Sequence, residues 1–214
     1  QLLTKELNRK ESAVLYLQKN GEGYAERKSV EKGLVFGYIG SINNIVDIEC
    51  ITEIISAVSK KRTVTLEIIG CGIKENEFVS LAKEKGIKTV FHGAIFNENV
   101  KKEIFKRCHF GVNIFKKSVV VGLTTKSMEY LESGLPLINS IPADTKKFIT
   151  EYHAGLDISD RKKVIDSLIN LSQMEYDRMQ QGALELFRNE FSTKQFETKL
   201  DDVMTKIVKG GQYD

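Results

Sequence analysis

The chain has 214 residues, of which 41% are hydrophobic and 29% are charged, and its formal net charge is +3 at pH 7. These proportions are ordinary for a soluble globular protein, and so small a charge, spread along the chain, argues against binding to nucleic acid. No apolar run approaches the roughly 18–20 residues of a membrane span, and no signal-peptide pattern is present. The three cysteines and three histidines lack the spacing of metal ligands. We therefore expect the cysteines to be buried free thiols in a reducing compartment. The cysteines and histidines are Cys50, Cys71, Cys108, His92, His109 and His153.

The first 33 residues are predicted to precede the main domain. Apolar residues recur there with a helical period, which predicts a helix within residues 1–19, and residues 20–32 are polar and typical of a linker. The sequence begins without a methionine. We therefore expect residues 1–33 to be the end of a preceding domain, or the chain to be a fragment of a longer protein.

From residue 33 onward, short apolar runs alternate with amphipathic segments. The runs predict six strands, at residues 34–39, 64–69, 89–91, 110–115, 135–138 and 155–158. The segments between them predict helices, and Asp47 and Asn97 are expected to cap two of these. Such alternation is typical of a doubly wound parallel sheet with helices on both faces, a Rossmann-like α/β fold. We predict one domain of this kind over residues 34–208.

Helices are predicted to complete the domain after the sixth strand. They cover Arg161–Leu171, Met174–Phe191 and a last segment, for which Ser192 and Gln195 predict a capping box. Four apolar residues of the last helix share one face, so we expect this face to pack inward. They are Phe196, Leu200, Val203 and Ile207.

The loop after the first predicted strand could hold a phosphate. Gly40 and Ser41 lie at the carboxyl end of that strand, where α/β sheets bind ligands. Glycine lets a phosphate approach the backbone, and Ser41 and Asn44 offer neutral hydrogen bonds. The third glycine of a dinucleotide fingerprint is missing, however, and an ordinary strand-to-helix turn explains these residues equally well.

The stretch Lys116–Asn139 carries the chemistry around which the rest is organised. A basic and β-branched segment leads through Thr124 and Thr125 into a short helix that bears Lys126 and Glu129. The free N–H groups and the dipole at a helix N-terminus favour an anion. Glu129 lies one turn below Thr125, so it can meet a group that is attached to that anion. The pattern fits a phosphate with a hydroxylated sugar, although a well-capped helix with solvated charges remains the alternative.

This stretch, GLTTKSMEYLESGLPLI, resembles the donor-binding signature of GT-B glycosyltransferases of the large family 4. A subgroup that builds surface polysaccharides has a similar spacing of Lys, Glu-Tyr-Leu, Gly and Pro, and the resemblance extends over about residues 34–208. The matching positions are Thr124 (in place of a proline), Lys126, Glu129, Tyr130, Leu131, Gly134 and Pro136.

The resemblance implies the C-terminal, donor-binding domain of a two-domain enzyme. Glu129 would bond the ribose, Ile95 and Asn97 would contact the base, and the backbone of Thr124 and Thr125 would approach the diphosphate. The first glutamate of the family motif, which meets the donor sugar, would fall at Val121. The pyrophosphate-gripping Arg and Lys after the first strand are also missing, with Ser41 and Val46 near their places. Gly40, Ser41 and Asn44 would line the site, and Lys126 is the best remaining cation and the expected catalytic residue.

The implied reaction moves a sugar from a UDP- or GDP-sugar to a hydroxyl acceptor with retention, without a metal or other cofactor. The acceptor, a glycan or a lipid-linked sugar, would bind the N-terminal domain that this chain lacks, so the isolated chain should turn over poorly or not at all. A cytoplasmic location is expected, with membrane contact only through the missing domain. Two rivals are another GT-B-like enzyme, such as a UDP-sugar epimerase or an inverting transferase, and a non-catalytic partner subunit.

Overall fold

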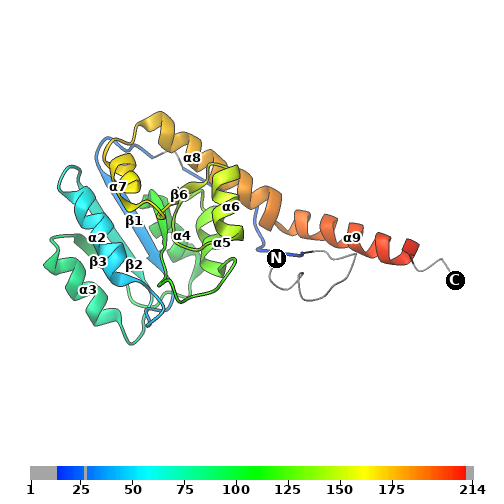
Figure 1. Ribbon diagram of the computed structural model, residues 1–214, viewed down its shortest axis with the longest axis horizontal. Coiled ribbons are helices and arrows are strands. Elements are labelled where there is room, and N and C mark those ends of the chain that lie inside the picture. Colours follow the sequence, from blue (N-terminus) through cyan, green and yellow to red (C-terminus); the bar gives the residue numbers. More distant parts are fainter. Residues whose placement is uncertain (1–13, 27, 211–214) are drawn as a thin grey trace.

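A computed structural model describes residues 14–26 and 28–210, and within it one parallel sheet has the strand order β3-β2-β1-β4-β5-β6 (Figure 1). Every pairing between neighbouring strands is parallel, which confirms the predicted doubly wound, Rossmann-like fold. The strands are β1 (Leu34–Ile39), β2 (Val64–Ile69), β3 (Lys88–Phe91), β4 (Phe110–Asn113), β5 (Leu137–Asn139) and β6 (Gly155–Asp157).

Helices cover both faces of the sheet because the central strands are apolar on both sides. In β1, Phe36 and Tyr38 are buried in one hydrophobic cluster, whereas Ile39 is buried in the other. The first cluster includes residues of α2 (Ile48–Ser59), α3 (Glu75–Glu84) and α7 (Arg161–Ile169). The second includes α4 (Glu98–Arg107), α5 (Thr125–Glu132) and α6 (Asp144–Glu151). Helix α8 (Gln173–Leu186) reaches both clusters, through Tyr176 and Ala183 respectively.

The sheet changes its winding direction between β1 and β4, and a tyrosine lies in the gap that opens there. The two strands pair only at Phe36–Phe110 and Gly37–Gly111. Further along, the N–H of Ile39 donates to Tyr130 Oη (2.7 Å), and this hydroxyl donates to the carbonyl of Val112 (3.3 Å). Tyr130 therefore joins the two strands where their own ladder has stopped. In a doubly wound sheet this switch point is where ligands bind.

The C-terminal helices differ from the prediction at their end. Helix α8 continues into a π-helical turn, Phe187–Phe191, and then α9 (Thr193–Gly210) extends away from the sheet (Figure 1). Leu200 and Met204 are 36% and 52% exposed, so the expectation that the face of Leu200 packs inward is wrong. The side chain of Ile207 lies outside the described residues. Of the predicted capping box, the contacts include only the bond from Gln195 N–H to Ser192 Oγ (3.4 Å).

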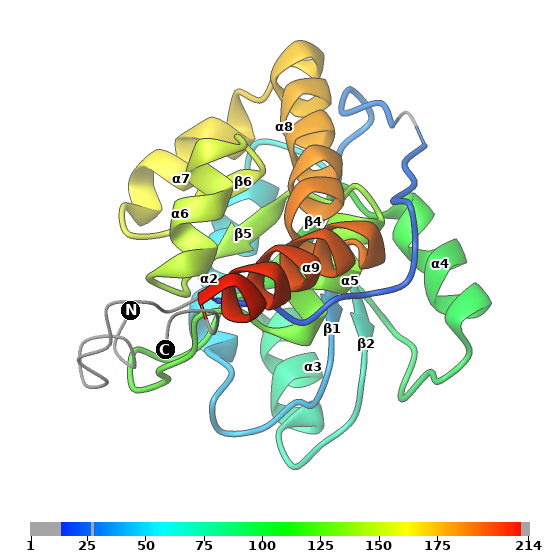
Figure 2. The same ribbon diagram turned by 90° about the vertical axis from the view of Figure 1, so that its right-hand side faces the viewer.

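The described residues before β1, 14–26 and 28–33, form an extended strap, and Figure 2 shows its first part beside α9. The predicted helix is wrong for Val14–Lys19, because this part has no helical turn, and residues 1–13 lie outside the described residues. Side chains of the domain bind the backbone of the strap in place of helical hydrogen bonds. Gln180 donates to the carbonyl of Glu26, and Arg188 donates to that of Glu22. The division into residues 1–33 and 34–208 stays a prediction.

The strap carries a buried lysine that stability measurements should reveal. Lys28 is 8% exposed, and within the described part of the chain its Nζ has no hydrogen-bond partner. Burial lowers the pKa of Lys28 to about 8. Between that pH and its ordinary pKa near 10.5, the unfolded chain binds the proton more tightly, so stability should rise with pH in this window.

We therefore expect Lys28→Met to stabilise the protein. One pKa unit corresponds to about 1.4 kcal/mol. The flexible stem relieves part of the penalty by turning toward water, so a gain of about 1–2 kcal/mol at pH 7 is expected. Urea unfolding at pH 7 and pH 10 measures it, with the exposed Lys32→Met as control. A loss of stability at pH 7 would show that the ammonium is well solvated in the fold.

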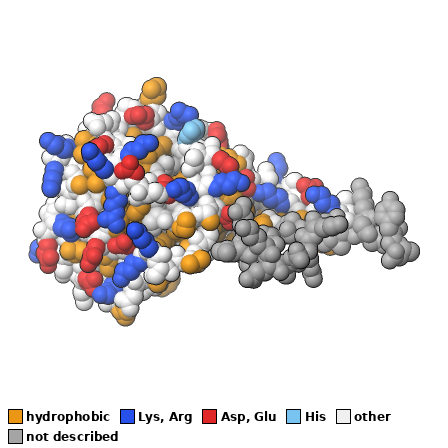
Figure 3. Space-filling view, viewed as in Figure 1, with side chains coloured by type: hydrophobic (Ala, Val, Ile, Leu, Met, Phe, Trp, Pro, Cys, Tyr) orange, Lys and Arg blue, Asp and Glu red, His pale blue; other side chains and the backbone are white. Residues whose placement is uncertain are grey.

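The surface mixes both signs of charge, as Figure 3 shows for one face, in agreement with the dispersed charge of the sequence. Among the described residues, no helix is long and apolar enough to cross a membrane. All three cysteines are free, but only Cys50 and Cys108 are buried. Cys71 is exposed, contrary to expectation, because it lies in the loop after β2 rather than within an element.

Candidate functional site

The N-terminus of α5 lies at the carboxyl edge of the sheet, and a polar network behind it fixes its position. Thr124 is the N-cap, and its hydroxyl accepts from the N–H of Ser127 (3.3 Å). The same hydroxyl donates to Asn113 Oδ1 (3.3 Å), while Asn113 Nδ2 donates to Asn139 Oδ1 (2.9 Å). Both asparagines are fully buried at the ends of β4 and β5. Thr125 is exposed, and its N–H has no intrahelical acceptor at this helix start.

Lys126 lies buried beside that helix start with aromatic rings around it. Its side chain is 9% exposed, and its Nζ is 4.1 Å from the ring centroid of Phe115 and 4.7 Å from that of Tyr38. Among the described residues, no carboxylate pairs with it. Burial lowers the pKa of Lys126 to about 7, because the ammonium has lost water and gained no counter-ion. The site therefore holds a desolvated amine, and a bound anion would favour its protonated form.

The loop after β1 meets this lysine. Gly40 has φ 122, and a Cβ placed on it would lie 3.9 Å from Lys126 Cδ, so the structure brings these two predicted residues together. Ser41 is exposed, and its carbonyl accepts from Tyr38 Oη (2.8 Å). Asn44 is also exposed, but it lines a separate cavity of about 70 Å³ that includes Lys116. The geometry thus supports Gly40 as a neighbour of Lys126 more directly than it supports Asn44.

The loops after β1, β2 and β3 are joined to one another by their backbones. Gly40 N–H donates to the carbonyl of Ile69 (3.0 Å), and Ile42 N–H donates to that of Cys71 (2.9 Å). Gly70 N–H in turn donates to the carbonyl of Gly93 (2.8 Å). A Cβ on Gly70 would lie 2.0 Å from the carbonyl oxygen of Gly40, so the close approach of these loops requires glycine. The carboxyl edge on this side is therefore a continuous, bonded rim.

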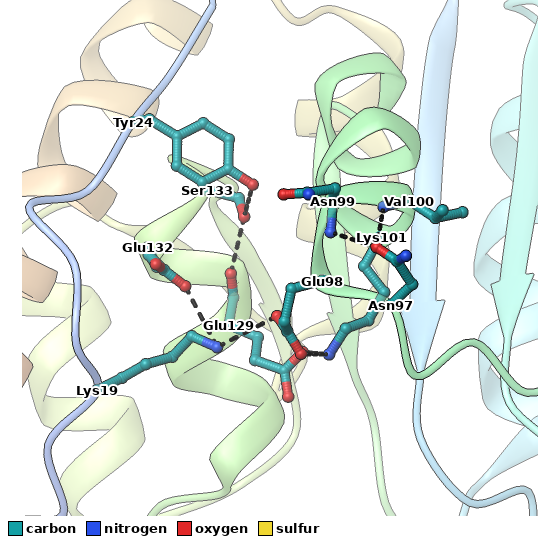
Figure 4. A network of polar contacts seen from close by, with 10 residues as sticks. All are labelled: Lys19, Tyr24, Asn97, Glu98, Asn99, Val100, Lys101, Glu129, Glu132 and Ser133. Carbon is teal, nitrogen blue, oxygen red and sulfur yellow. Dashed lines mark hydrogen bonds and ion pairs between the residues drawn. The ribbon is translucent and has the colours of Figure 1, made fainter.

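Glu129 faces α4 and takes part in an ionic network (Figure 4). Lys101 lies between two carboxylates, at 3.0 Å from Glu129 Oε2 and 2.5 Å from Glu98 Oε1. Lys19 of the strap pairs with Glu98 (3.7 Å) and with the buried Glu132 (3.4 Å). Glu129 is thus held in place by α4, with 23% of its side chain still exposed.

The two residues predicted to meet a base lie just before α4. Asn97 is the N-cap of α4, as predicted, and its Oδ1 accepts from the N–H groups of Asn99 (3.0 Å) and Val100 (3.3 Å). Its amide nitrogen has no bond in this cap. Ile95 is half-buried and packs against the cluster that includes Ile69. The loop 93–97 therefore leads directly into α4, the helix whose Lys101 holds Glu129.

Sequence reasoning missed three residues that shape the site. Tyr130 belongs to the signature motif, but the spacing of the motif does not show that its hydroxyl joins β1 to β4. Asn113 was placed inside an apolar strand, where a polar side chain is itself a signal that a partner is buried nearby. Lys101 had no such signal, since its pairing with Glu129 depends on how α4 and α5 lie in space.

Comparison with known proteins supports the fold and the family. Among curated protein sequences, none matches this chain. Solved structures that resemble it include S. aureus TarM in a complex with UDP (TM-score 0.67, 14% identity) and the lipopolysaccharide outer core galactosyltransferase WaaB (TM-score 0.70, 15% identity). The chain is covered to 94% and 95% in these matches, but it spans only 41% of TarM and 59% of WaaB.

A third similar structure is the catalytic domain of the cholesterol-α-glucosyltransferase from Helicobacter pylori (TM-score 0.58, 20% identity), with 73% of this chain and 98% of that chain covered. At these identities the likenesses establish the shared GT-B-type, Rossmann-like fold. The family rests on sequence: the profile of the glycosyl transferases group 1 matches residues 33–174, and the chain therefore belongs to the glycosyl transferases group 1.

Proposed function

We propose that this chain is the donor-binding half of a glycosyltransferase that moves a sugar from a UDP- or GDP-sugar to a hydroxyl acceptor. The acceptor would be a glycan or a lipid-linked sugar, in the synthesis of a polysaccharide or glycoconjugate in the cytoplasm or at the inner membrane face. Membership of the glycosyl transferases group 1 supports glycosyl transfer, and the complex of the similar TarM with UDP supports a nucleotide donor. Because the chain spans only part of TarM and WaaB, the acceptor site is assigned to a further domain.

One observation carries the proposal: Lys126 is a buried amine that no carboxylate of the described residues pairs with, at a helix start on the switch point of the sheet. A buried ammonium is stable only when it is paired. A diphosphate at the N-terminus of α5 would supply that pair and would also accept from the N–H groups of Thr125 and Lys126. Gly40, which already approaches Lys126, leaves room for a phosphate next to the backbone of the β1 loop.

The proposed chemistry follows from this placement. When the bond between the anomeric carbon and the donor phosphate breaks, the electron pair stays on the diphosphate. Lys126 and the N-terminus of α5 would stabilise the charge that develops there, which is where preorganised donors contribute most. The acceptor hydroxyl would attack on the face that the leaving group vacates and pass its proton to the diphosphate, so that configuration is retained. This scheme requires neither a metal ion nor a protein nucleophile.

Glu129 would bind the ribose of the nucleotide. Lys101 holds the carboxylate in place but leaves it partly exposed, and a carboxylate can accept about four hydrogen bonds. The loop with Ile95 and Asn97 lies on the same side, so a base attached to that ribose would reach it. The exposed Ser41 would complete the site from the β1 loop, whereas Asn44, which lines the neighbouring cavity with Lys116, would contact the donor only if that cavity joins the site.

A non-catalytic partner subunit is the second candidate, and one observation favours it. The hydroxyl of Thr124 already caps α5, and Glu129 already pairs with Lys101. These two polar groups therefore have partners in the fold before any ligand arrives. In this alternative the site is a remnant and binds no nucleotide.

Calorimetric titration of the full chain separates the two candidates. UDP, GDP, UDP-glucose, UDP-N-acetylglucosamine and GDP-mannose would be titrated in turn. The donor-binding proposal predicts saturable binding of one nucleotide family. The absence of heat and of thermal stabilisation with every ligand would favour the subunit.

The ribose role of Glu129 predicts a specific loss in Glu129→Gln. Replacing a charged acceptor by a neutral one should weaken binding of the ribonucleotide by about 1–2 kcal/mol. Binding of the 2′-deoxy analogue should change less, so the mutant loses its preference for ribose. The measurement is the ratio of the two affinities. Glu103→Gln is a matched control, since Glu103 pairs with Lys106 on the exposed side of α4. An equal loss for both nucleotides would make Glu129 a purely structural residue.

A further inference from the structure

The first turn of α6 places a carboxylate against the loop that leads into α5. Asp144 is the first residue of α6. A Cβ placed on Gly122 would lie 3.3 Å from Asp144 Oδ2, so the carboxylate lies over the Cα of this glycine. The next residue, Thr145, donates its N–H (3.1 Å) and its hydroxyl to the carbonyl of Gly122. Thr145 thus holds the loop at Gly122, three residues before Thr125, and Asp144 contacts the loop at the same point.

Asp144 retains acceptor capacity in this position. It is half-buried, and among the described residues no Lys or Arg pairs with it. The hydroxyl of Tyr16 hydrogen-bonds its carboxylate. Burial and the nearby Asp144 raise the pKa of Tyr16 to about 12, so this hydroxyl stays protonated and acts as the donor. One donated bond leaves most of the four or so lone-pair positions of a carboxylate free.

The loop itself offers no carboxylate to a ligand. From Lys116 to Met128 the sequence contains no Asp or Glu. A sugar attached to a diphosphate at the start of α5 presents several hydroxyl donors within a few ångströms of the last phosphate. Each hydroxyl that loses water needs an acceptor, and charged acceptors form the strongest such bonds. Asp144 brings a charged acceptor to this loop from a neighbouring element.

We propose that Asp144 accepts hydrogen bonds from the hydroxyl groups of the donor's sugar and so helps to select that sugar. The inference rests on the proposed donor-binding function and goes beyond it, because it names a sugar-contacting residue outside the signature stretch. Asp144 also lies at a helix start, where an acid interacts favourably with the free N–H groups. That local role affects stability alone and predicts no difference between a nucleotide and its sugar ester.

The test compares UDP with UDP-glucose and UDP-N-acetylglucosamine, and GDP with GDP-mannose, on the full chain. In Asp144→Asn, the affinity for the nucleoside diphosphate should stay within about twofold, whereas the affinity for the preferred nucleotide-sugar should fall about tenfold. Asp144→Glu keeps the charge and should recover part of that loss. Asp160→Asn is the matched control, because Asp160 is the N-cap of α7 and accepts from Lys163 N–H (3.0 Å).

The outcomes separate this inference from the function on which it rests. If the unmutated chain binds the nucleoside diphosphate but Asp144→Asn weakens neither ligand, or both equally, the sugar contact is wrong and the donor function stands. If the unmutated chain binds the sugar ester no differently from the diphosphate, the contact is wrong as well. If it binds none of these ligands, both proposals fail. Thermal unfolding of Asp144→Asn and Asp160→Asn distinguishes a folding defect from a lost contact.

Discussion

Lys126→Met should abolish most of the affinity for a nucleoside diphosphate while the fold stays intact. Removing one partner of a buried charge pair costs about 2–4 kcal/mol, which corresponds to roughly a 30- to 700-fold weaker affinity. Binding of the nucleoside without phosphates should change little. Methionine fills the space between Tyr38 and Phe115 without burying a charge, so the free energy of unfolding at pH 7 should not fall. Titrations with a nucleoside and its diphosphate, together with urea unfolding, measure both effects.

The same lysine should make diphosphate binding depend on pH. Its pKa of about 7 in the free protein is far below its ordinary value, so at pH 8 most molecules carry the neutral amine. An anion favours the ammonium form, so binding at pH 8 should take up close to one proton, and the affinity should fall as the pH rises above 7. Calorimetry in two buffers of different ionisation enthalpy counts this proton.

Lys117→Met is the control for both measurements, since Lys117 is exposed on the same loop. It should leave the affinity and the proton count unchanged. Equal losses for nucleoside and diphosphate in Lys126→Met, or a proton count unaffected by this mutation, would rule out Lys126 as the phosphate cation.

Tyr130→Phe should be the most destabilising conservative change at the switch point. It leaves the buried N–H of Ile39 and the carbonyl of Val112 without their shared partner. Two unsatisfied buried groups should together lower the free energy of unfolding by about 2–4 kcal/mol. Because the hydroxyl holds β1 to the strand that leads into the α5 loop, affinity for the diphosphate should fall as well.

Tyr176→Phe provides the comparison for this change. Tyr176 is fully buried too, but its hydroxyl makes only long bonds: it donates to the carbonyl of His109 (3.3 Å) and accepts from Gln180 Nε2 (3.4 Å). Its replacement should cost about 1 kcal/mol or less. Urea unfolding of the two variants, measured side by side, gives the difference. Equal costs would mean that the hydroxyl of Tyr130 contributes no more than an ordinary buried hydrogen bond.

The sequence predicted those structural features that depend on residues close together in the chain. The short apolar run Leu34–Ile39 indicated a strand, and Asp47 and Asn97 are the N-caps that their positions suggested. Lys126 was located correctly at the start of a helix. Its burial between Tyr38 and Phe115 could not be predicted, because it depends on the ends of β1 and β4 lying side by side.

The errors have a similar physical origin. A helical period shows which face of the last helix is apolar, but it does not show whether the same chain covers that face, and Leu200 is partly exposed. At the other end of the described chain, Lys19 N–H donates to the carbonyl of Phe191 (3.0 Å), and Tyr24 N–H donates to that of Glu132 (2.7 Å). Such long-range bonds stabilise an extended strap where local propensity favoured a helix in Val14–Lys19.

The bonded rim of loops after β1, β2 and β3 determines where the entropy of ligand binding is lost. Those loops exchange backbone hydrogen bonds before any ligand arrives, so a diphosphate approaching Gly40 orders little on that side. The segment 116–122 carries Val120 at 84% exposure, and it is attached to the β1 loop by the bond from Lys116 N–H to the carbonyl of Ile45 (2.9 Å) and to α6 at Gly122. The entropy lost on ligand binding should therefore come mainly from the ordering of residues 116–122. Movement of the same segment should be the slow step of ligand release. A substitution at Gly70 would separate the loops after β1 and β2, so that ligand binding would have to order both sides of the site.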